Sequence, residues 1–281
     1  MTLMRRTVRT DDDVMLDVCD TGGDGVPLVL LHGWMQSQEL FRHQLADGAE
    51  RRVVSVDMRG HGLSEKPEHG YRISRLAADL RDVLASLEIG SADLLGVSMG
   101  VSVIWSYLEL FGDELVRSLI LVDQQAALVA QPWMSAQEAA DAGSILPADG
   151  LAALAAAIAA DDGENAVRAY IRSMFTGAVD ADLWELVTAE ALRTPRRVGA
   201  ALLVDHGFQD WRDRLPLITV PTLVIGCEGS HVPVLSQRYV AARIPGAEVH
   251  VFPRAVADSH FPFLENPIAF NERVGRFLDD R

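Results

Sequence analysis

Apolar runs alternate with segments of helical periodicity through the first 123 residues. Residues 5–10 and 14–20 have the composition of β-strands. Nearly continuous apolar runs then follow at 27–31, 53–57, 92–97 and 116–123. Runs of this kind are typical of strands that are covered on both faces, as in a parallel sheet. The pattern therefore predicts a central sheet whose later strands are fully buried.

The segment between two of these runs has the spacing of an amphipathic helix. Apolar side chains recur there at intervals of three and four residues, at Ile73, Leu76, Leu80, Val83, Leu84 and Leu87. Charged side chains occupy the opposite face, which is typical of a helix that packs on a sheet. Strands that alternate with helices indicate βαβ units. We predict an α/β fold with a mostly parallel central sheet flanked by helices.

The pattern changes after residue 123. Residues 124–213 contain no convincing strand but an alanine-rich stretch at 151–160 and helical segments near 135–142, 147–160, 164–175, 180–192 and 195–211. Strand patterns resume at 222–226 and 247–252, and a last helix is predicted from Asn266 and Pro267 to residue 278. We expect a core domain of residues 1–123 and 214–281, with a helical cap of residues 124–213 inserted after strand six.

Composition narrows the classes of partner. The chain has 281 residues, with 40 acidic and 25 basic side chains and a formal charge of −15. This charge repels nucleic-acid backbones and anionic membrane surfaces. No apolar stretch has the length of a membrane span, and the basic residues at the N-terminus are not followed by the apolar core of a signal peptide, which predicts a cytoplasmic protein. The two cysteines, Cys19 and Cys227, form neither a disulfide framework nor a metal-ligand spacing.

The stretch DLLGVSMGVS, residues 93–102, carries the first candidate for chemistry. Gly96, Ser98 and Gly100 fit the pattern G-x-S-x-G, with a predicted strand before the serine and a predicted helix after it. A serine on a sharp strand-to-helix turn adopts a strained backbone, and small neighbours allow that turn to close. We interpret Ser98 as a nucleophile, with a tight structural turn as the alternative.

A serine hydroxyl needs a histidine base, and that histidine needs an acid to orient it. Among the histidines, His43 and His69 lie in polar segments, His206 lies in the helical block, and His250 alternates along a predicted strand. His260 differs from these because it follows the last strand in a loop and precedes the apolar residues FPF. His260 is therefore the candidate base.

Four motifs together resemble the α/β-hydrolase superfamily over nearly the whole chain. They are His32-Gly33-Trp34, DMRGHGLS at 57–64, the turn at Ser98, and SHFPFLENP at 259–267. The chain is most similar to small carboxylesterases, lactonases and cofactor-free haloperoxidase-like esterases. This resemblance implies that Ser98 is the nucleophile, that His260 is the base, and that the backbone N–H groups of Trp34 and Met99 form an oxyanion hole. It implies neither a metal nor an organic cofactor.

The acid departs from the pattern of that family. The family usually places an aspartate four residues before a proline in the loop after strand seven, and counting back from Pro233 gives Gly229. Glu228 is one residue away. A second position exists at Asp123, where strand six ends and where some members of the superfamily carry the acid. We favour Asp123 as the acid and keep Glu228 as the fallback.

Three functions remain open from the sequence. The first is a serine hydrolase that cleaves an ester, lactone or thioester of a moderately hydrophobic small molecule through an acyl-enzyme on Ser98. The second is a cofactor-free dioxygenase of the same fold, in which His260 is the base that deprotonates a 3-hydroxy-4-quinolone ring. The third is a hydrolase-fold binding protein without catalysis. Epoxide hydrolase and haloalkane dehalogenase activities are disfavoured because both need a carboxylate where Ser98 stands.

Overall fold

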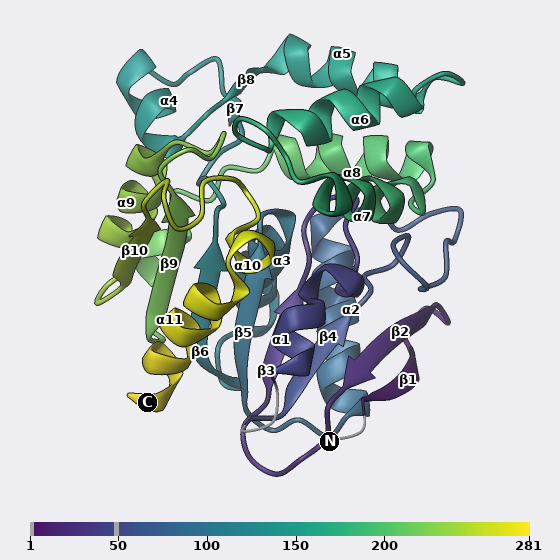
Figure 1. Cartoon of the computed structure of the whole chain (residues 1–281), viewed down its shortest axis with the longest axis vertical. Helices are drawn as coiled ribbons and strands as arrows, with labels where there is room; N and C mark the ends of the chain where they lie inside the picture. The colour runs from purple at the N-terminus through teal and green to yellow at the C-terminus, as the bar shows by residue number, and fades with distance from the viewer. Residues whose placement is uncertain (1–2, 48–50) are drawn as a thin grey trace.

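The computed structural model describes residues 3–47 and 51–281 and is built around one eight-stranded sheet (Figure 1). Its strands run in the order β1-β2-β4-β3-β5-β6-β9-β10. Their bounds are β1 (Met4–Arg9), β2 (Met15–Asp20), β3 (Leu28–Leu31), β4 (Val53–Val56), β5 (Ala92–Val97), β6 (Val116–Val122), β9 (Thr222–Cys227) and β10 (Glu248–Phe252). β2 pairs antiparallel with β1 and β4, and the other pairs are parallel. The predicted mostly parallel α/β sheet is confirmed.

Burial explains why the strands could be recognised from their composition. Every residue of β3, β4, β5 and β9 is buried, as expected for the interior of a sheet with helices on both faces. β1 lies at the edge, and most of its side chains are exposed. The continuous apolar runs therefore mark the central strands.

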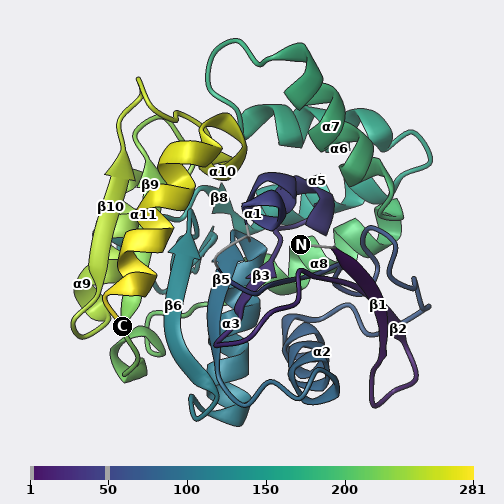
Figure 2. The same ribbon diagram turned by 60° about the horizontal axis from the view of Figure 1, so that its bottom comes forward.

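Helices cover both faces of the sheet. α1 (Arg42–Ala46) and α11 (Pro267–Asp279) contact each other on one face, and α2 (Ile73–Ser86) and α3 (Met99–Phe111) contact each other on the opposite face (Figures 1 and 2). α9 (Val234–Arg243) packs on β9 and β10, and the short α10 (Pro262–Glu265) contacts α11. The last helix begins as predicted, because the Asn266 side chain accepts a hydrogen bond from the Ala269 N–H at 3.1 Å.

The helices between β6 and β9 lie across one end of the sheet (Figure 1). They are α4 (Ala136–Ala142), α5 (Ala148–Ala159), α6 (Glu164–Ser173), α7 (Ala181–Leu192) and α8 (Arg196–Gly207). The expectation of no strand in this segment is wrong in one detail. β7 (Val129–Ala130) and β8 (Leu146–Pro147) form a short parallel pair. Two-residue strands are too short to leave an alternating pattern in the sequence.

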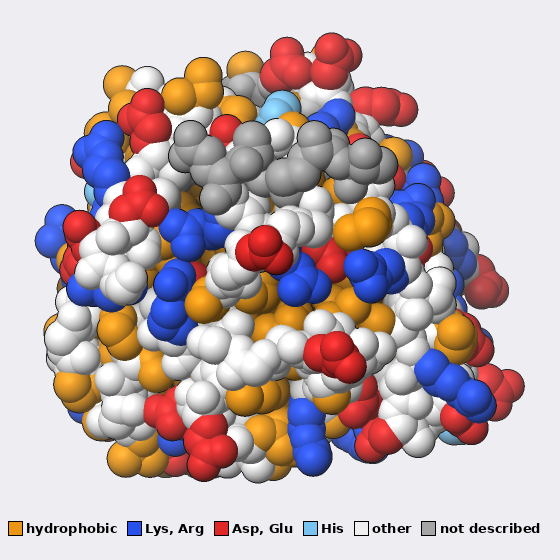
Figure 3. All heavy atoms as spheres, turned by 90° about the horizontal axis from the view of Figure 1, so that it is seen from below, with side chains coloured by type: hydrophobic (Ala, Val, Ile, Leu, Met, Phe, Trp, Pro, Cys, Tyr) orange, Lys and Arg blue, Asp and Glu red, His pale blue; other side chains and the backbone are white. Residues whose placement is uncertain are grey.

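The helices are short, and the surface carries charges of both signs. Across the described residues, no helix is long and apolar enough to cross a membrane. The face opposite α4–α8, where both termini lie, shows basic and acidic side chains interspersed among apolar ones (Figure 3).

Candidate active site

Ser98 occupies a strained turn between β5 and α3. Its backbone has φ 52° and ψ −124°, a conformation that L-residues rarely adopt and that costs about 1–3 kcal/mol. The turn is held by two backbone hydrogen bonds, from Ser98 N–H to the Val122 carbonyl and from Val101 N–H to the Ser98 carbonyl, each 2.8 Å long. The side chain remains partly exposed at the end of the sheet.

The two glycines of the motif allow three elements to approach closely. A Cβ added to Gly96 would lie 2.7 Å from the backbone nitrogen of Val101 in α3. A Cβ added to Gly100 would overlap the Leu31 carbonyl oxygen at the end of β3. Either side chain would push the helix away from the sheet, so the turn at Ser98 requires both glycines.

Asp123 follows β6 and lies beside the serine turn. β5 and β6 pair in register up to Val97 and Val122. The residues that follow, Ser98 and Asp123, are therefore neighbours. Parallel strands are spaced about 4.8 Å apart, which brings Ser98 and Asp123 to adjacent positions at one edge of the sheet. Asp123 is fully buried, with φ 50°.

His260 pairs with that aspartate. Its Nδ1–H donates to Asp123 Oδ2 at 2.7 Å, and both side chains are almost completely buried. The backbone N–H of His260 donates to the Met174 carbonyl at 3.1 Å, which ties its loop to the end of α6. His260 Nε2 has no hydrogen-bond partner among the residues that the structure describes. One ring nitrogen is thus oriented by a carboxylate, and the other is open to a further group.

The alternative acid lies elsewhere. Glu228 is exposed, and its Oε2 accepts a hydrogen bond from the Arg254 N–H at 3.1 Å. At Gly229, where the family usually has its aspartate, an added Cβ would overlap the carboxylate of Asp258. The structure therefore brings Asp123, and neither of these two positions, into contact with His260.

The two backbone groups expected to hold an oxyanion lie on neighbouring segments. Met99 is the first residue of α3, and the first N–H groups of a helix have no acceptor within it. A Cβ on Gly100 would lie 2.8 Å from the His32 carbonyl oxygen, so the loop that carries Trp34 packs against the start of α3. The helix N-terminus adds a partial positive charge at the same place.

The Trp34 side chain joins this loop to the helices above the sheet. Its indole N–H donates to the Gly199 carbonyl of α8 at 2.7 Å. Its ring meets Tyr170 of α6 edge-to-face, with 5.3 Å between the ring centroids. Movement of α6 or α8 would therefore displace the backbone of the predicted oxyanion loop.

His32 and His61 support the same loop from below. The N–H of Met58 donates to His32 Nε2 at 3.0 Å, and the N–H of Met35 donates to His61 Nε2 at 3.3 Å. Both rings are buried, and burial lowers the pKa of His32 to about 4 and that of His61 to about 3. Neutral rings that accept backbone hydrogen bonds have a structural role.

Two further histidines lie near His260, and sequence reasoning did not assign them to the site. The ring of His231, in the loop after β9, lies 4.7 Å from that of His260. Burial lowers the pKa of His231 to about 3 and that of His206, in α8, to about 4, and the charge of His260 adds to both shifts. His231 could have been found because it stands in the loop searched for the acid. The sequence around His206 contains no motif that would have assigned this histidine to the site.

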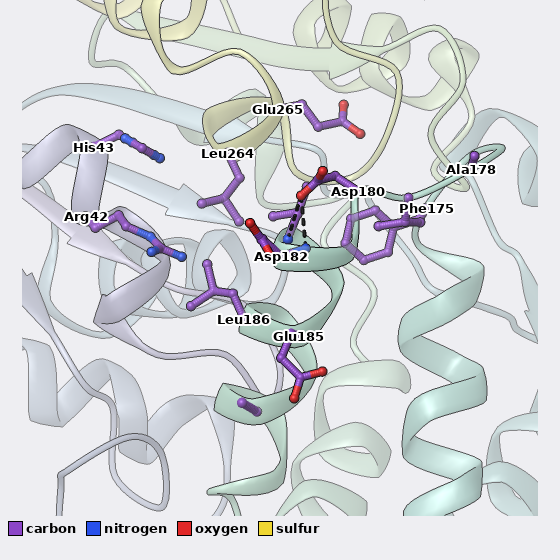
Figure 4. Close-up of a pocket in the computed structure, with 13 residues that line it drawn as sticks. Arg42, His43, Phe175, Ala178, Asp180, Asp182, Glu185, Leu186, Leu264 and Glu265 are labelled. Carbon is purple, nitrogen blue, oxygen red and sulfur yellow. Dashed lines mark hydrogen bonds between the residues drawn. The ribbon is translucent and has the colours of Figure 1, made fainter.

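A separate hollow of about 700 Å³ opens between α7, α10 and α1 (Figure 4). Phe175 lines it, and Phe175 stacks on Phe261, the residue after His260, with 4.7 Å between the ring centroids. None of Ser98, Asp123 and His260 lines this hollow. It therefore lies outside the candidate active site.

The chain is similar to known proteins in both its sequence and its fold. A family model described as the alpha/beta hydrolase fold matches residues 26–267. A putative non-heme chloroperoxidase from Synechocystis is 29% identical over 249 residues, which cover 85% of this chain and 86% of that protein. An esterase from Rhodococcus, whose structure is known, is 29% identical, with a TM-score of 0.82 over 98% of each chain. An esterase from Exiguobacterium antarcticum, at 24% identity, shares the fold with a TM-score of 0.86 over 98% of this chain and 100% of that chain.

The matched region runs from the residues before β3 to the residue that follows Asn266. It includes the His-Gly-Trp segment, the turn at Ser98 and the loop of His260, and the fold is similar to the folds of the solved esterases. The chain is therefore an enzyme that belongs to the α/β-hydrolase fold family.

Proposed function

We propose that this chain is a serine hydrolase that cleaves an ester, lactone or thioester of a small molecule through an acyl-enzyme on Ser98. The observation that carries the proposal is the buried 2.7 Å pair of His260 and Asp123 beside the strained turn of Ser98. A histidine oriented by a carboxylate next to a strained serine is the arrangement that activates a hydroxyl as a nucleophile.

His260 is the general base of the first step. Its Nε2 takes the proton of Ser98 Oγ as that oxygen attacks the substrate carbonyl, and Asp123 stabilises the imidazolium that forms. The missing partner on Nε2 agrees with this role, because catalytic hydrogen bonds are often long before the substrate binds. Histidine then protonates the leaving alcohol or thiol.

The tetrahedral oxygen needs donors that are already in place. We assign this role to the backbone N–H groups of Trp34 and Met99, because the loop that carries Trp34 packs against the start of α3. Losing one such donor typically costs about 3–4 kcal/mol of transition-state stabilisation. Water activated by His260 then attacks the acyl-enzyme and releases the acid. Every step is acid–base or acyl chemistry and needs no metal or organic cofactor.

The helices α4–α8 form the cap in this proposal, over a core of residues 1–123 and 214–281. In support of this role, these helices lie across the end of the sheet at which β5 ends and α3 begins. α5 is rich in alanine and buries Leu151 and Ile158. Apolar caps of this kind favour a moderately hydrophobic substrate.

A fluorophosphonate probe tests the activated nucleophile directly. The probe forms a phosphorus–oxygen bond with an activated serine and releases fluoride, and peptide mapping then identifies the labelled residue. We expect labelling at Ser98 that is lost in Ser98→Ala and in His260→Ala. Ser102 is the matched control, because it lies one turn further along α3, is buried and has no hydrogen-bond partner for its hydroxyl among the described residues. Ser102→Ala should label normally.

The labelling result and an oxygen-uptake assay together separate the proposal from its alternatives. Absence of labelling in the folded wild-type protein would contradict an activated Ser98. Oxygen uptake with a 3-hydroxy-4-quinolone, retained in Ser98→Ala, would instead support the dioxygenase.

The chain is also 36% identical to a soluble epoxide hydrolase from Corynebacterium over 110 residues. These residues cover 39% of this chain and 38% of that protein. Ser98 argues against that chemistry here, because an epoxide hydrolase uses a carboxylate nucleophile.

A further inference from the structure

The hydroxyl of Ser230 contacts the same carboxylate oxygen as His260. Ser230 lies in the loop after β9, and its Oγ–H donates to Asp123 Oδ2, the oxygen that also accepts the hydrogen bond from His260 Nδ1. The Val232 N–H donates to Ser230 Oγ at 3.1 Å. Because a serine hydroxyl has a single proton, the acceptor role toward Val232 leaves that proton for Asp123.

The two oxygens of Asp123 are therefore unequal. Oδ2 accepts from two side chains, while Oδ1 has no partner in the described part of the chain and lies over Gly226, where an added Cβ would be 3.6 Å away. A carboxylate that accepts a hydrogen bond through only one of its oxygens can still rotate about its Cβ–Cγ bond. The second donor on Oδ2 restricts that rotation and keeps Oδ2 directed at the imidazole.

We propose that Ser230 is a positioning residue for the Asp123–His260 pair, and that it sets both the orientation and the basicity of His260. The inference rests on the proposed function of Ser98 and His260. A hydrogen bond donated to a carboxylate disperses its negative charge, so the carboxylate stabilises an imidazolium less strongly. The loop that usually supplies the acid in this family thus supplies a donor to an acid on the neighbouring strand.

Other titratable groups around the pair come from three segments. They are His206 of α8, Cys227 and His231 of the β9 segment, and Asp258 and Glu265 of the segment that carries His260. Burial lowers the pKa of His231 to about 3 and that of His206 to about 4, and burial raises the pKa of the Cys227 thiol. These directions favour neutral rings and a neutral thiol near pH 7.

The pH dependence of kcat/KM for p-nitrophenyl acetate tests the proposal. In Ser230→Ala we expect the acid limb of the profile to move to higher pH by about half a unit to one unit, because an undispersed carboxylate stabilises imidazolium better. We expect kcat to fall by about tenfold, the value of one hydrogen bond to a charged group. Ser230→Thr keeps the hydroxyl and should restore the position of the limb.

Ser118 is a matched control at the other end of the sheet. It is also a buried serine whose hydroxyl donates to a buried aspartate, Asp93, at 2.6 Å. Ser118→Ala should lower stability without moving the acid limb. If Ser230→Ala also loses stability but keeps the wild-type limb, its role is structural and the proposal is wrong.

A measurement without turnover keeps this test separate from the proposed function. The imidazole resonances of His260, assigned by their loss in His260→Ala, can be titrated by NMR in the wild-type and Ser230→Ala proteins. A shifted titration in Ser230→Ala supports the role of Ser230 even if no ester is hydrolysed, in which case only the proposed function fails. Superimposable titrations in an active enzyme overturn the role of Ser230 alone.

Discussion

The loops after β6 and after β9 begin at the same edge of the sheet, yet the acidic residue of one is buried and that of the other is exposed. Asp123, directly after β6, is fully buried and accepts hydrogen bonds from His260 and Ser230. Glu228, directly after β9, is exposed and contacts the backbone of Arg254. Both strands are parallel neighbours, so the sheet alone would allow either loop to face His260.

Local packing decides between the loops. Asp123 has φ 50°, and its N–H donates to the Ile225 carbonyl of β9 at 2.8 Å, which turns its side chain inward. In the β9 loop, the Asp258 carboxylate fills the space that a side chain at Gly229 would need. The position of an acid near a strand end therefore matters less than the space and the partners available to it.

Removing the acid should give the largest effect. We expect Asp123→Asn to lower kcat for an ester substrate by about 10⁴-fold, because the amide would hold the imidazole in the wrong tautomer. Glu228→Gln should change kcat by no more than about twofold, since exposed charges contribute little. Steady-state hydrolysis of p-nitrophenyl esters measures both. Retained activity in Asp123→Asn, with loss in Glu228→Gln, would assign the acid to the β9 loop.

Filling the space at Gly229 should give a smaller effect, on stability. Gly229→Ala should lower the free energy of unfolding by about 1–3 kcal/mol, the usual cost of overpacking. Urea denaturation measures the change. Asp258→Ala in the same chain should relieve it only in part, because the Asp258 backbone carbonyl would still lie 2.7 Å from the new Cβ.

A matched glycine shows whether the effect is local. Gly90 has no heavy atom within 4 Å of the position of an added Cβ, so Gly90→Ala should leave the free energy of unfolding nearly unchanged. Equal stability of the Gly229→Ala and wild-type proteins would show that the β9 loop has room for a side chain, and the steric explanation for its missing acid would fail.

The pH dependence of stability should give the smallest effect. Burial lowers the pKa of His231, in the β9 loop, to about 3, whereas an unfolded histidine titrates near 6.5. Between these values the unfolded chain binds more protons than the folded chain, so the free energy of unfolding falls as the pH falls. Between pH 7.5 and pH 5.5, His231 should lower the free energy of unfolding by about 1.4 kcal/mol.

Urea denaturation at pH 7.5 and 5.5 measures this loss. His231→Asn should reduce the difference between the two pH values, because the variant has no imidazole to protonate. His69 is the control, since its side chain is 92% exposed and His69→Asn should keep the wild-type difference. An unchanged difference in His231→Asn would show that the β9 loop does not hold this ring away from water.

The pattern of apolar residues and the glycine motif were enough to predict the sheet and the turn. Continuous apolar runs identified the buried strands because parallel strands lose contact with water on both faces. Gly96 and Gly100 marked the turn at Ser98 because only glycine tolerates the close approach of α3 to β5 and β3. His260 stood out by its place after the last strand. Its role, like that of Ser98, stays a prediction until the probe experiment is done.

The residues that surround His260 could be identified only from the folded chain. Asp123 and Ser230 are 107 residues apart in the chain and meet through the pairing of β6 with β9. His231 and His206 reach the same place from a loop and a helix that have no shared pattern in the sequence. Periodicity reports the face of an element that is buried, but contacts between elements depend on register, loop direction and the volume left by neighbours such as Asp258.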